Sequence, residues 1–276
     1  MYLVSGATGN VGGEVVRALA DQGLPVRAVV RSAARWEPVE HVEAVEADLD
    51  DPATLDPWLD GVEGAFLLPG FPDMPGLYRK LREAGVVRVV QLSGSSAESG
   101  DTANAVTAMM LDTETAARES GLLWTILRPS GFDSNALRWL PQLREGDLVR
   151  APWGEIPVAC IDPADIAAVA ATALTNPGHE GAIHRISGPR PMLPAEQIAV
   201  LARVLDRPLR FENLSPQETR FQLESTMPQP FVDAFLDFYV KGSLDESPVF
   251  RTVEEITGRP PRTFEQWAEA HAADFR

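Results

Sequence analysis

Short apolar runs alternate with amphipathic stretches along the first half of the chain. Residues 1–6 form an apolar run typical of a strand, and residues 10–23 carry apolar positions at helical spacing and end on a glycine. The same alternation predicts further strands at 24–31, 42–48, 64–70, 86–94 and 122–131, with helices at 51–59, 74–85 and 103–121. This rhythm predicts an α/β fold, a Rossmann-type doubly wound parallel sheet with helices on both faces.

The pattern changes after residue 131. Prolines and tryptophans become frequent, helices are expected at 162–174, 193–205, 229–240 and 263–273, and one more strand is expected at 182–188. We therefore expect a Rossmann core at 1–131 and a smaller, mostly helical C-terminal region at 132–276 that packs against the carboxyl edge of the sheet. The two regions are interleaved, because the strand and helix near 155–190 are expected to return to the core.

Composition narrows the class of protein. The 276 residues are 45% hydrophobic, which is enough for a sizeable core, and the net charge of −16 argues against direct nucleic-acid binding and against adhesion to anionic membranes. We expect no membrane span and no signal peptide. The single cysteine, Cys160, cannot form an intrachain disulfide and is expected to be a small core residue. These features favour a cytoplasmic protein, monomeric or dimeric.

A glycine-rich turn follows the first strand. In GATGNVG, Gly6 permits a tight turn, Gly9 permits close approach of a pyrophosphate, and Gly12 lets the helix pack near the strand. Backbone N–H groups at the start of the helix, including that of Val11, then face the phosphates, and the side chains of Thr8 and Asn10 add hydrogen bonds. A purely structural turn is the alternative. The position between a strand and a helix favours dinucleotide binding.

The end of the second strand indicates which dinucleotide. NAD-preferring sites usually carry Asp or Glu there, to bind the ribose 2′-hydroxyl. This chain has Arg31, followed by Arg35, and an arginine attracts a 2′-phosphate. We therefore expect NADP(H) to be preferred, with NAD(H) possible; the alternative is that both are solvated surface arginines.

Several motifs together resemble one family. GATGNVG, RAVVR, EADLDD, VVQLSG, SGLLWTILRP, IDPADIAAVAATAL, GPRPML and ITGRPPRTF occur in the order typical of the NmrA-like group of atypical short-chain dehydrogenases/reductases. The resemblance runs from Met1 to near Ala270. It implies that residues 1–131 bind NAD(P) and that residues 132–276 bind substrate.

The resemblance also implies where the cofactor lies. Asp48 and Leu49 match the pair beside the adenine, although Asp48 is also a good helix cap. The positions that match the nicotinamide side all lie at the carboxyl ends of predicted strands, where doubly wound folds bind ligands: Leu68, Pro69, Gly70, Ser93, Gly94, Pro129 and Ser130.

The usual catalytic pair of this superfamily is missing. No tyrosine stands four residues before a lysine, and the expected segment carries Met109, Met110 and Leu111. This argues against Tyr–Lys carbonyl reduction and against epimerisation. The catalytic residues are therefore unassigned, and the candidates to orient a substrate oxygen are Ser93, Ser95 and Ser96; serines that only satisfy loop backbone are the alternative.

Apolar residues in or near the loops expected over the nicotinamide indicate a pocket that accepts aromatic molecules. The expected lining is Phe71, Met74, Met109, Met110, Phe132, Trp139 and Trp153, for each of which core packing is the alternative. The four histidines show no ligand spacing, so no metal is expected.

Two functions fit these features. The first is an oxidoreductase that transfers hydride from NADPH to a small apolar or aromatic electrophile, such as a quinone, azo compound, imine or enone, without a Tyr–Lys donor. The second is a non-catalytic NAD(P)-binding redox sensor that acts through a protein partner, which the NmrA-like resemblance allows.

Overall fold

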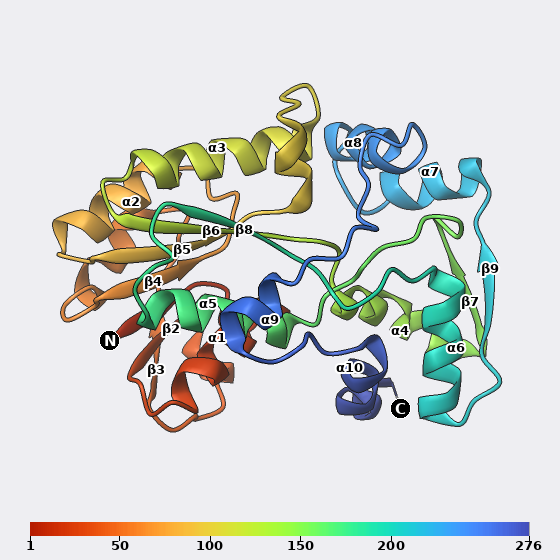
Figure 1. Ribbon diagram of the computed structural model, residues 1–276, viewed down its shortest axis with the longest axis horizontal. Helices are drawn as coiled ribbons and strands as arrows, with labels where there is room; N and C mark the ends of the chain where they lie inside the picture. Colours follow the sequence, from red (N-terminus) through yellow and green to blue (C-terminus); the bar gives the residue numbers. More distant parts are fainter. Residues whose placement is uncertain (276) are drawn as a thin grey trace.

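A parallel sheet forms the centre of the protein (Figure 1). The computed structural model describes residues 1–275, apart from the Arg35 side chain. Seven strands in this part lie in the order β3-β2-β1-β4-β5-β6-β8, and every neighbouring pair is parallel. They are β1 Tyr2–Val4, β2 Val26–Val30, β3 Val42–Glu46, β4 Gly64–Leu67, β5 Arg88–Leu92, β6 Leu123–Pro129 and β8 Ala182–Ile186. The expected doubly wound sheet is confirmed.

Helices cover both faces of the sheet and bury a separate core on each. On one face lie α1 (Asn10–Ala20), α5 (Pro163–Thr175) and α9 (Thr252–Thr257), and α1 packs along α5. On the other face lie α2 (Met74–Glu83) and α3 (Ala105–Glu119). Short 3₁₀ turns join several of these elements: η1 Ala33–Arg35, η2 Pro52–Trp58 and η3 Ser95–Ser99. The helix expected at 51–59 is therefore a 3₁₀ segment, and Pro57 lies inside it.

The C-terminal half has a core of its own, centred on Trp267. Its elements are η4 Asp133–Trp139, α4 Leu140–Glu145, β7 Leu148–Ala151, α6 Pro194–Leu205, β9 Arg210–Asn213, α7 Pro216–Glu224, α8 Gln229–Tyr239, α10 Phe264–Ala270 and η5 Ala272–Phe275. Strands β7 and β9 pair in parallel as a second small sheet, which the hydrophobic pattern does not predict. In Figure 1 these elements lie beside the half that contains the large sheet. No described helix combines the length and the apolar character that crossing a membrane requires.

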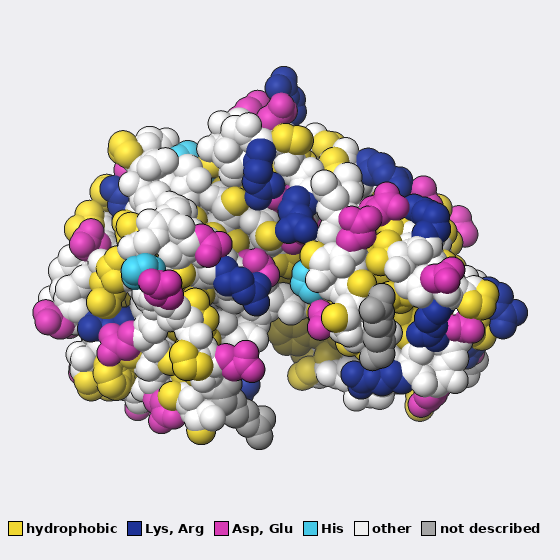
Figure 2. Space-filling model, turned by 90° about the horizontal axis from the view of Figure 1, so that it is seen from below, with side chains coloured by type: hydrophobic (Ala, Val, Ile, Leu, Met, Phe, Trp, Pro, Cys, Tyr) yellow, Lys and Arg dark blue, Asp and Glu magenta, His cyan; other side chains and the backbone are white. Residues whose placement is uncertain are grey.

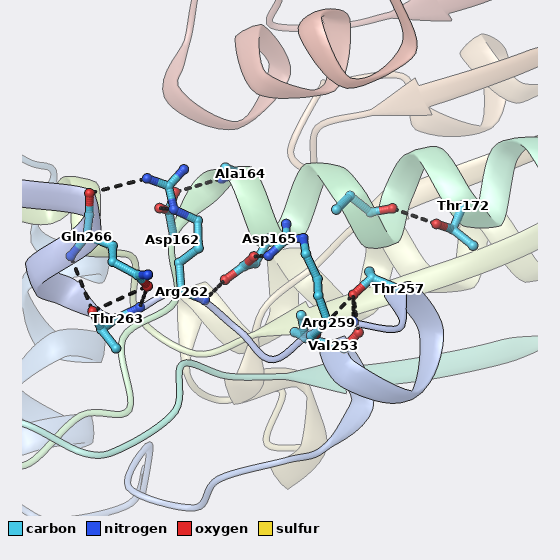
Figure 3. A network of polar contacts seen from close by, with 11 residues as sticks. Asp162, Ala164, Asp165, Thr172, Val253, Thr257, Arg259, Arg262, Thr263 and Gln266 are labelled. Atoms are coloured by element: carbon cyan, nitrogen blue, oxygen red, sulfur yellow. Dashed lines mark hydrogen bonds and ion pairs between the residues drawn. The ribbon is translucent and has the colours of Figure 1, made fainter. Parts of the chain in front are cut away.

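An ion-pair network fastens the chain between α9 and α10 to the start of α5 (Figure 3). Asp162 caps α5 through the Ala164 N–H at 2.8 Å, and its Oδ2 lies 3.1 Å from Arg262 Nε. Asp165 accepts from Arg259 Nη1 at 2.5 Å and from the Arg262 N–H at 2.6 Å. Two of the motifs that carry the family resemblance, IDPADIAAVAATAL and ITGRPPRTF, are thus in direct contact.

Candidate functional site

The turn between β1 and α1 has the geometry of a phosphate-binding loop. Gly6 has a φ of +62°, and a Cβ at this position would lie 2.3 Å from Leu68 Cδ1. A Cβ on Gly12 would lie 2.3 Å from the Gly6 carbonyl oxygen, so only glycine allows α1 to approach the turn this closely. The Gly9 N–H donates to the Gly6 carbonyl at 2.8 Å and closes the turn.

The first turn of α1 is open to a ligand. Gly9 occupies the N-cap position, no described side chain caps the helix, and Thr8, Gly9 and Asn10 are exposed. The N–H groups of Asn10, Val11 and Gly12 belong to the first helical turn, where an α-helix offers no backbone acceptor. The positive end of the helix dipole therefore faces solvent at this turn, which suits the pyrophosphate of a dinucleotide.

The other sequence-predicted adenosine-side residues lie at the ends of β2 and β3. Arg31 directly follows β2 and is exposed, whereas the Arg35 side chain lies outside the described part of the structure. Asp48 is exposed, and its Oδ1 accepts from the Asp50 N–H at 3.1 Å, so it shapes its own turn. Leu49 is buried in the core below α2.

Methionines from α3 cover the loops after β4 and β5. The Gly70 N–H donates to Thr113 Oγ1 at 3.3 Å, and a Cβ on Gly70 would lie 2.9 Å from Met109 Sδ. A Cβ on Gly94 would lie 3.7 Å from Met110 Cε. The segment in which the resemblance places the Tyr–Lys pair therefore presents thioethers to this edge of the sheet.

Serine hydroxyl groups hold the other loops predicted for the nicotinamide side. The Leu68 N–H donates to Ser5 Oγ at 2.8 Å, and Pro69 follows it in the same half-buried loop. Pro129 ends β6, and the hydroxyl of the next residue, Ser130, donates to the Ala159 carbonyl. These contacts hold the ends of β4 and β6 in fixed positions.

The three candidate serines occupy different environments. Ser93 is 3% exposed and donates to Glu114 Oε1 at 2.7 Å, and Ser96 is 5% exposed. Ser95 is half-buried and donates to Glu246 Oε1 at 2.6 Å. Glu246 also accepts from Tyr239 Oη at 2.8 Å. Ser95 lines a cavity beside Glu246.

A buried carboxylate holds Ser93 in place. Glu114 of α3 receives a forked pair of hydrogen bonds from Arg128 Nε and Nη2, both at 2.7 Å, and an ion pair from Arg118. Burial raises the pKa of Glu114. The hydrogen bonds from Arg128 and Ser93 and the charges of both arginines outweigh burial and leave the pKa below its ordinary value. Glu114 is therefore ionised and joins α3 to the ends of β5 and β6.

A cavity of about 150 Å³ opens next to this cluster. Its lining mixes hydroxyl, ionic and apolar groups: Ser95, Glu98, Ser99, Arg128, Ser130, Arg185, Ser243, Leu244, Asp245, Glu246, Pro248 and Phe250. Arg185 pairs with Glu98 at 2.6 Å and stacks over Phe250, with 4.2 Å between its guanidinium carbon and the ring centroid. Both arginines of the cavity are thus already paired with carboxylates.

The predicted apolar lining is divided between several places. Met74 is 5% exposed and packs with Phe71 into the core below α2, Phe132 packs against the core below α1 and α5, and Trp139 packs against the C-terminal core. Trp153, with a φ of +65°, lies against Tyr239 with 5.1 Å between the ring centroids. Met109, Met110 and Trp153 are therefore the members of this group that lie near the polar residues described above.

Sequence reasoning did not select Glu114, Arg128, Tyr239 or Glu246. Arg128 carried a usable signal, because a charged residue inside the apolar strand LLWTILRP needs a partner. Glu246 carried no such signal, since Ser95, Tyr239 and Glu246 come from distant segments.

On the face of the molecule shown in Figure 2, a hollow with apolar side chains on its floor separates the half with the sheet from the C-terminal half.

The parallel sheet and the open glycine turn define a Rossmann-type dinucleotide-binding protein. The chain belongs to the NAD(P)H-binding family, since the model with that description matches residues 6–177. Over its full length the chain is 43% identical to 99% of the (4-alkanoyl-5-oxo-2,5-dihydrofuran-3-yl)methyl phosphate reductase of Streptomyces griseus. It is 36% identical, again over its full length, to 99% of the NAD(P)H azoreductase of Xenophilus azovorans.

Solved structures share the fold of this chain. The NADPH-dependent quinone oxidoreductase of Escherichia coli, solved with NADPH, matches 99% of this chain and all of its own with 25% identity and a TM-score of 0.75. The negative transcriptional regulator NmrA matches 97% of this chain and 94% of its own with 17% identity and a TM-score of 0.75, which shows a common fold. The three similar enzymes are thus named as reductases or oxidoreductases, and the names of two of them include NAD(P)H or NADPH.

Proposed function

We propose that this protein is an NADPH-preferring reductase of small conjugated electrophiles, with residues 1–131 as the cofactor-binding core and residues 132–276 as the substrate side. One observation carries the proposal: parallel strands bring the open glycine turn, the methionine-covered loops and the Ser95–Glu246 cavity to one edge of the sheet. When bound, NADPH supplies a hydride from its nicotinamide ring.

The glycine turn fits the cofactor. Its close approach to α1, which a Cβ on Gly12 would prevent, leaves room and N–H donors for a pyrophosphate. Toward the nicotinamide side, the thioethers of Met109 and Met110 lie beside Gly70 and Gly94 and give the loops after β4 and β5 an apolar neighbour.

The residues that line the cavity favour hydride acceptors whose reduction needs no strong proton donor from the protein. A quinone, an azo compound, an imine or an unsaturated lactone or enone takes hydride at a conjugated atom, and the resulting anion takes a proton from water. Apolar contacts from α3 suit the conjugated part of such a molecule. The hydroxyl groups of Ser95 and Ser130 donate their protons to Glu246 and to the Ala159 carbonyl, so their oxygens suit a hydrogen-bond donor on the substrate. The reductase from Streptomyces griseus is named for a substrate of this kind, an unsaturated lactone phosphate.

The test is oxidation of NADPH by the purified chain against a panel of acceptors. The panel holds a quinone, an azo dye, an imine, an enone and an unsaturated lactone with and without a phosphate group. We expect turnover with at least one member and a clear ranking between the two lactones. Tight binding of NADPH with no turnover across the panel would instead support the redox sensor, which the thioethers of Met109 and Met110 at the position of the usual proton donor also favour.

A further inference from the structure

A carboxylate stands at the adenosine end of the proposed cofactor site. Glu46 is the last residue of β3 and lies opposite Val30, the last residue of β2, in the register of the sheet. Its Oε1 accepts a hydrogen bond from the Ala33 N–H at 2.6 Å. Ala33 comes two residues after Arg31, in the loop expected to receive a 2′-phosphate. The carboxylate of Glu46 and the guanidinium of Arg31 therefore belong to the two sides of the same loop.

We propose that Glu46 is a specificity-determining residue, which weakens binding of the 2′-phosphate of NADPH and supports binding of NADH. The proposal rests on the proposed function, because it requires a dinucleotide at the glycine turn. It goes further by assigning a role to a residue on β3. In NAD-preferring sites an acidic residue at the end of the second strand binds the ribose 2′-hydroxyl. Here Arg31 follows that strand, and the neighbouring strand supplies the acid.

The backbone of Glu46 is fixed on both sides. Its carbonyl accepts from Trp58 Nε1 at 3.1 Å, and the N–H of the following residue, Ala47, donates to the Val30 carbonyl at 3.2 Å. The carboxylate can therefore leave Ala33 only by rotation of its own side chain, with loss of a charge-assisted hydrogen bond.

This arrangement affects the two cofactors differently. A 2′-phosphate has either to displace the carboxylate from the Ala33 N–H or to bind beside a like charge, and both weaken binding. NADH has no 2′-phosphate, and its ribose hydroxyl can donate to the carboxylate. Arg31 attracts the phosphate and opposes this effect, so the two residues together set a modest preference for NADPH in place of a strict one.

Two substitutions separate charge from hydrogen bonding. Glu46→Gln keeps an oxygen that accepts from the Ala33 N–H but removes the charge, whereas Glu46→Ala removes both. The measurements are dissociation constants of the full chain for NADPH and NADH, and for adenosine 2′,5′-bisphosphate and adenosine 5′-monophosphate as probes of the adenosine end alone. None of these measurements depends on turnover.

We expect Glu46→Gln to tighten NADPH and the bisphosphate roughly 5-fold, as removal of one like charge near the protein surface should, and to weaken NADH about 2-fold. The monophosphate, like NADH, should bind slightly less tightly. Glu46→Ala should shift the ratio of the two dissociation constants in the same direction, with lower overall affinity because the loop loses its anchor. Glu40→Gln is the matched control, since Glu40 is an exposed acid at the other end of β3 and should leave the ratio unchanged.

An unchanged NADPH-to-NADH ratio in Glu46→Gln overturns the proposal, and so does weaker binding of NADPH by this variant, since Glu46 would then assist the phosphate. Failure of the wild-type chain to bind any dinucleotide overturns the proposed function together with this inference. A shifted ratio without turnover of any acceptor supports the inference and contradicts only the reductase.

Discussion

Arg128 at the end of β6 donates two parallel hydrogen bonds of 2.7 Å each to Glu114 of α3. Glu114 is completely buried, and its remaining hydrogen-bonding capacity is taken by Ser93 and Arg118. The pair therefore fixes the ends of two neighbouring strands relative to α3, whose methionines lie over the loops after β4 and β5. A cluster of charges therefore adds to the apolar packing of α3 in setting the geometry of this edge.

We expect Glu114→Gln to destabilise the protein by about 3 kcal/mol, because it leaves the Arg128 guanidinium buried without a counter-charge. The measurement is the free energy of unfolding from urea denaturation. Glu119→Gln, an exposed acid one turn further along α3, should change it by less than about 0.5 kcal/mol. Equal stability of the two variants would contradict the role given to Glu114.

The carboxylate of Glu114 also makes the stability of the folded protein depend on pH. The pKa of Glu114 is lower in the folded protein than its ordinary 4.5, so its contribution is complete above pH 4.5 and is lost as pH falls through the folded value. The wild-type chain should lose stability below pH 4.5 more steeply than Glu114→Gln, as unfolding curves at a series of pH values can show.

Asp133 should produce the opposite dependence. Burial, together with the charges of Asp162 and Asp165, raises its pKa from 3.8 to about 8, and neither of its oxygens has a hydrogen-bond partner within the described residues. The folded protein therefore holds a proton that the unfolded chain releases near pH 3.8, and stability falls as pH rises toward 8.

Replacing Asp133 by Asn should remove its share of that slope, which approaches about 1.4 kcal/mol per pH unit for one group. The variant should be more stable than the wild type at pH 8, and the difference should shrink toward pH 4. Asp60→Asn, at an exposed turn before β4, serves as the control and should leave the slope intact. A slope that persists in Asp133→Asn would show that other groups cause it.

Gly12→Ala tests the phosphate loop. The added Cβ would lie 2.3 Å from the Gly6 carbonyl oxygen and 2.6 Å from the Ser5 carbonyl oxygen, so α1 has to move away from the turn. We expect at least a 10-fold loss of NADPH affinity in fluorescence titrations. Gly13→Ala is the matched control: its Cβ would lie 3.2 Å from the Ala7 carbonyl oxygen, a contact that a small shift relieves, and its affinity should stay within about 3-fold of the wild type.

The large sheet was predictable because its inner strands are mostly apolar runs between turn signals, as strands covered on both faces must be. The edge strands β3 (VEAVE) and β8 (AIHRI) are more polar, but they continue the alternation of strands and helices. Strands β7 and β9 were not predictable from the sequence. Each has four residues, only two of the eight are buried, and their partners stand some 60 positions apart, so neither length nor alternation marks them.

The candidate site was predictable where one local segment forms it. The glycine turn is complete within seven residues, and its geometry follows from the absence of Cβ atoms. The Ser95–Glu246–Tyr239 cluster depends on how the C-terminal half folds back, which no local pattern encodes. For the same reason Met74 and Trp139, placed near the site by their position in loops, pack into cores.

Arg31→Ala should weaken NADPH far more than NADH, because Arg31 is the cation next to the expected 2′-phosphate and NADH lacks that group. A loss of roughly 10-fold for NADPH and less than about 2-fold for NADH corresponds to one charge-assisted contact of about 1.4 kcal/mol. Arg17 is an exposed arginine on α1 that pairs with Glu14, so Arg17→Ala is the control and should affect binding of both cofactors equally.

Because the contact between Arg31 and the 2′-phosphate is expected to be ionic and exposed, raising the salt concentration should reduce the preference of the wild type for NADPH. The preference of Arg31→Ala should stay nearly constant. Equal losses of affinity for both cofactors in Arg31→Ala would show that the 2′-phosphate does not bind at the end of β2. The role inferred for Glu46 would then be wrong as well.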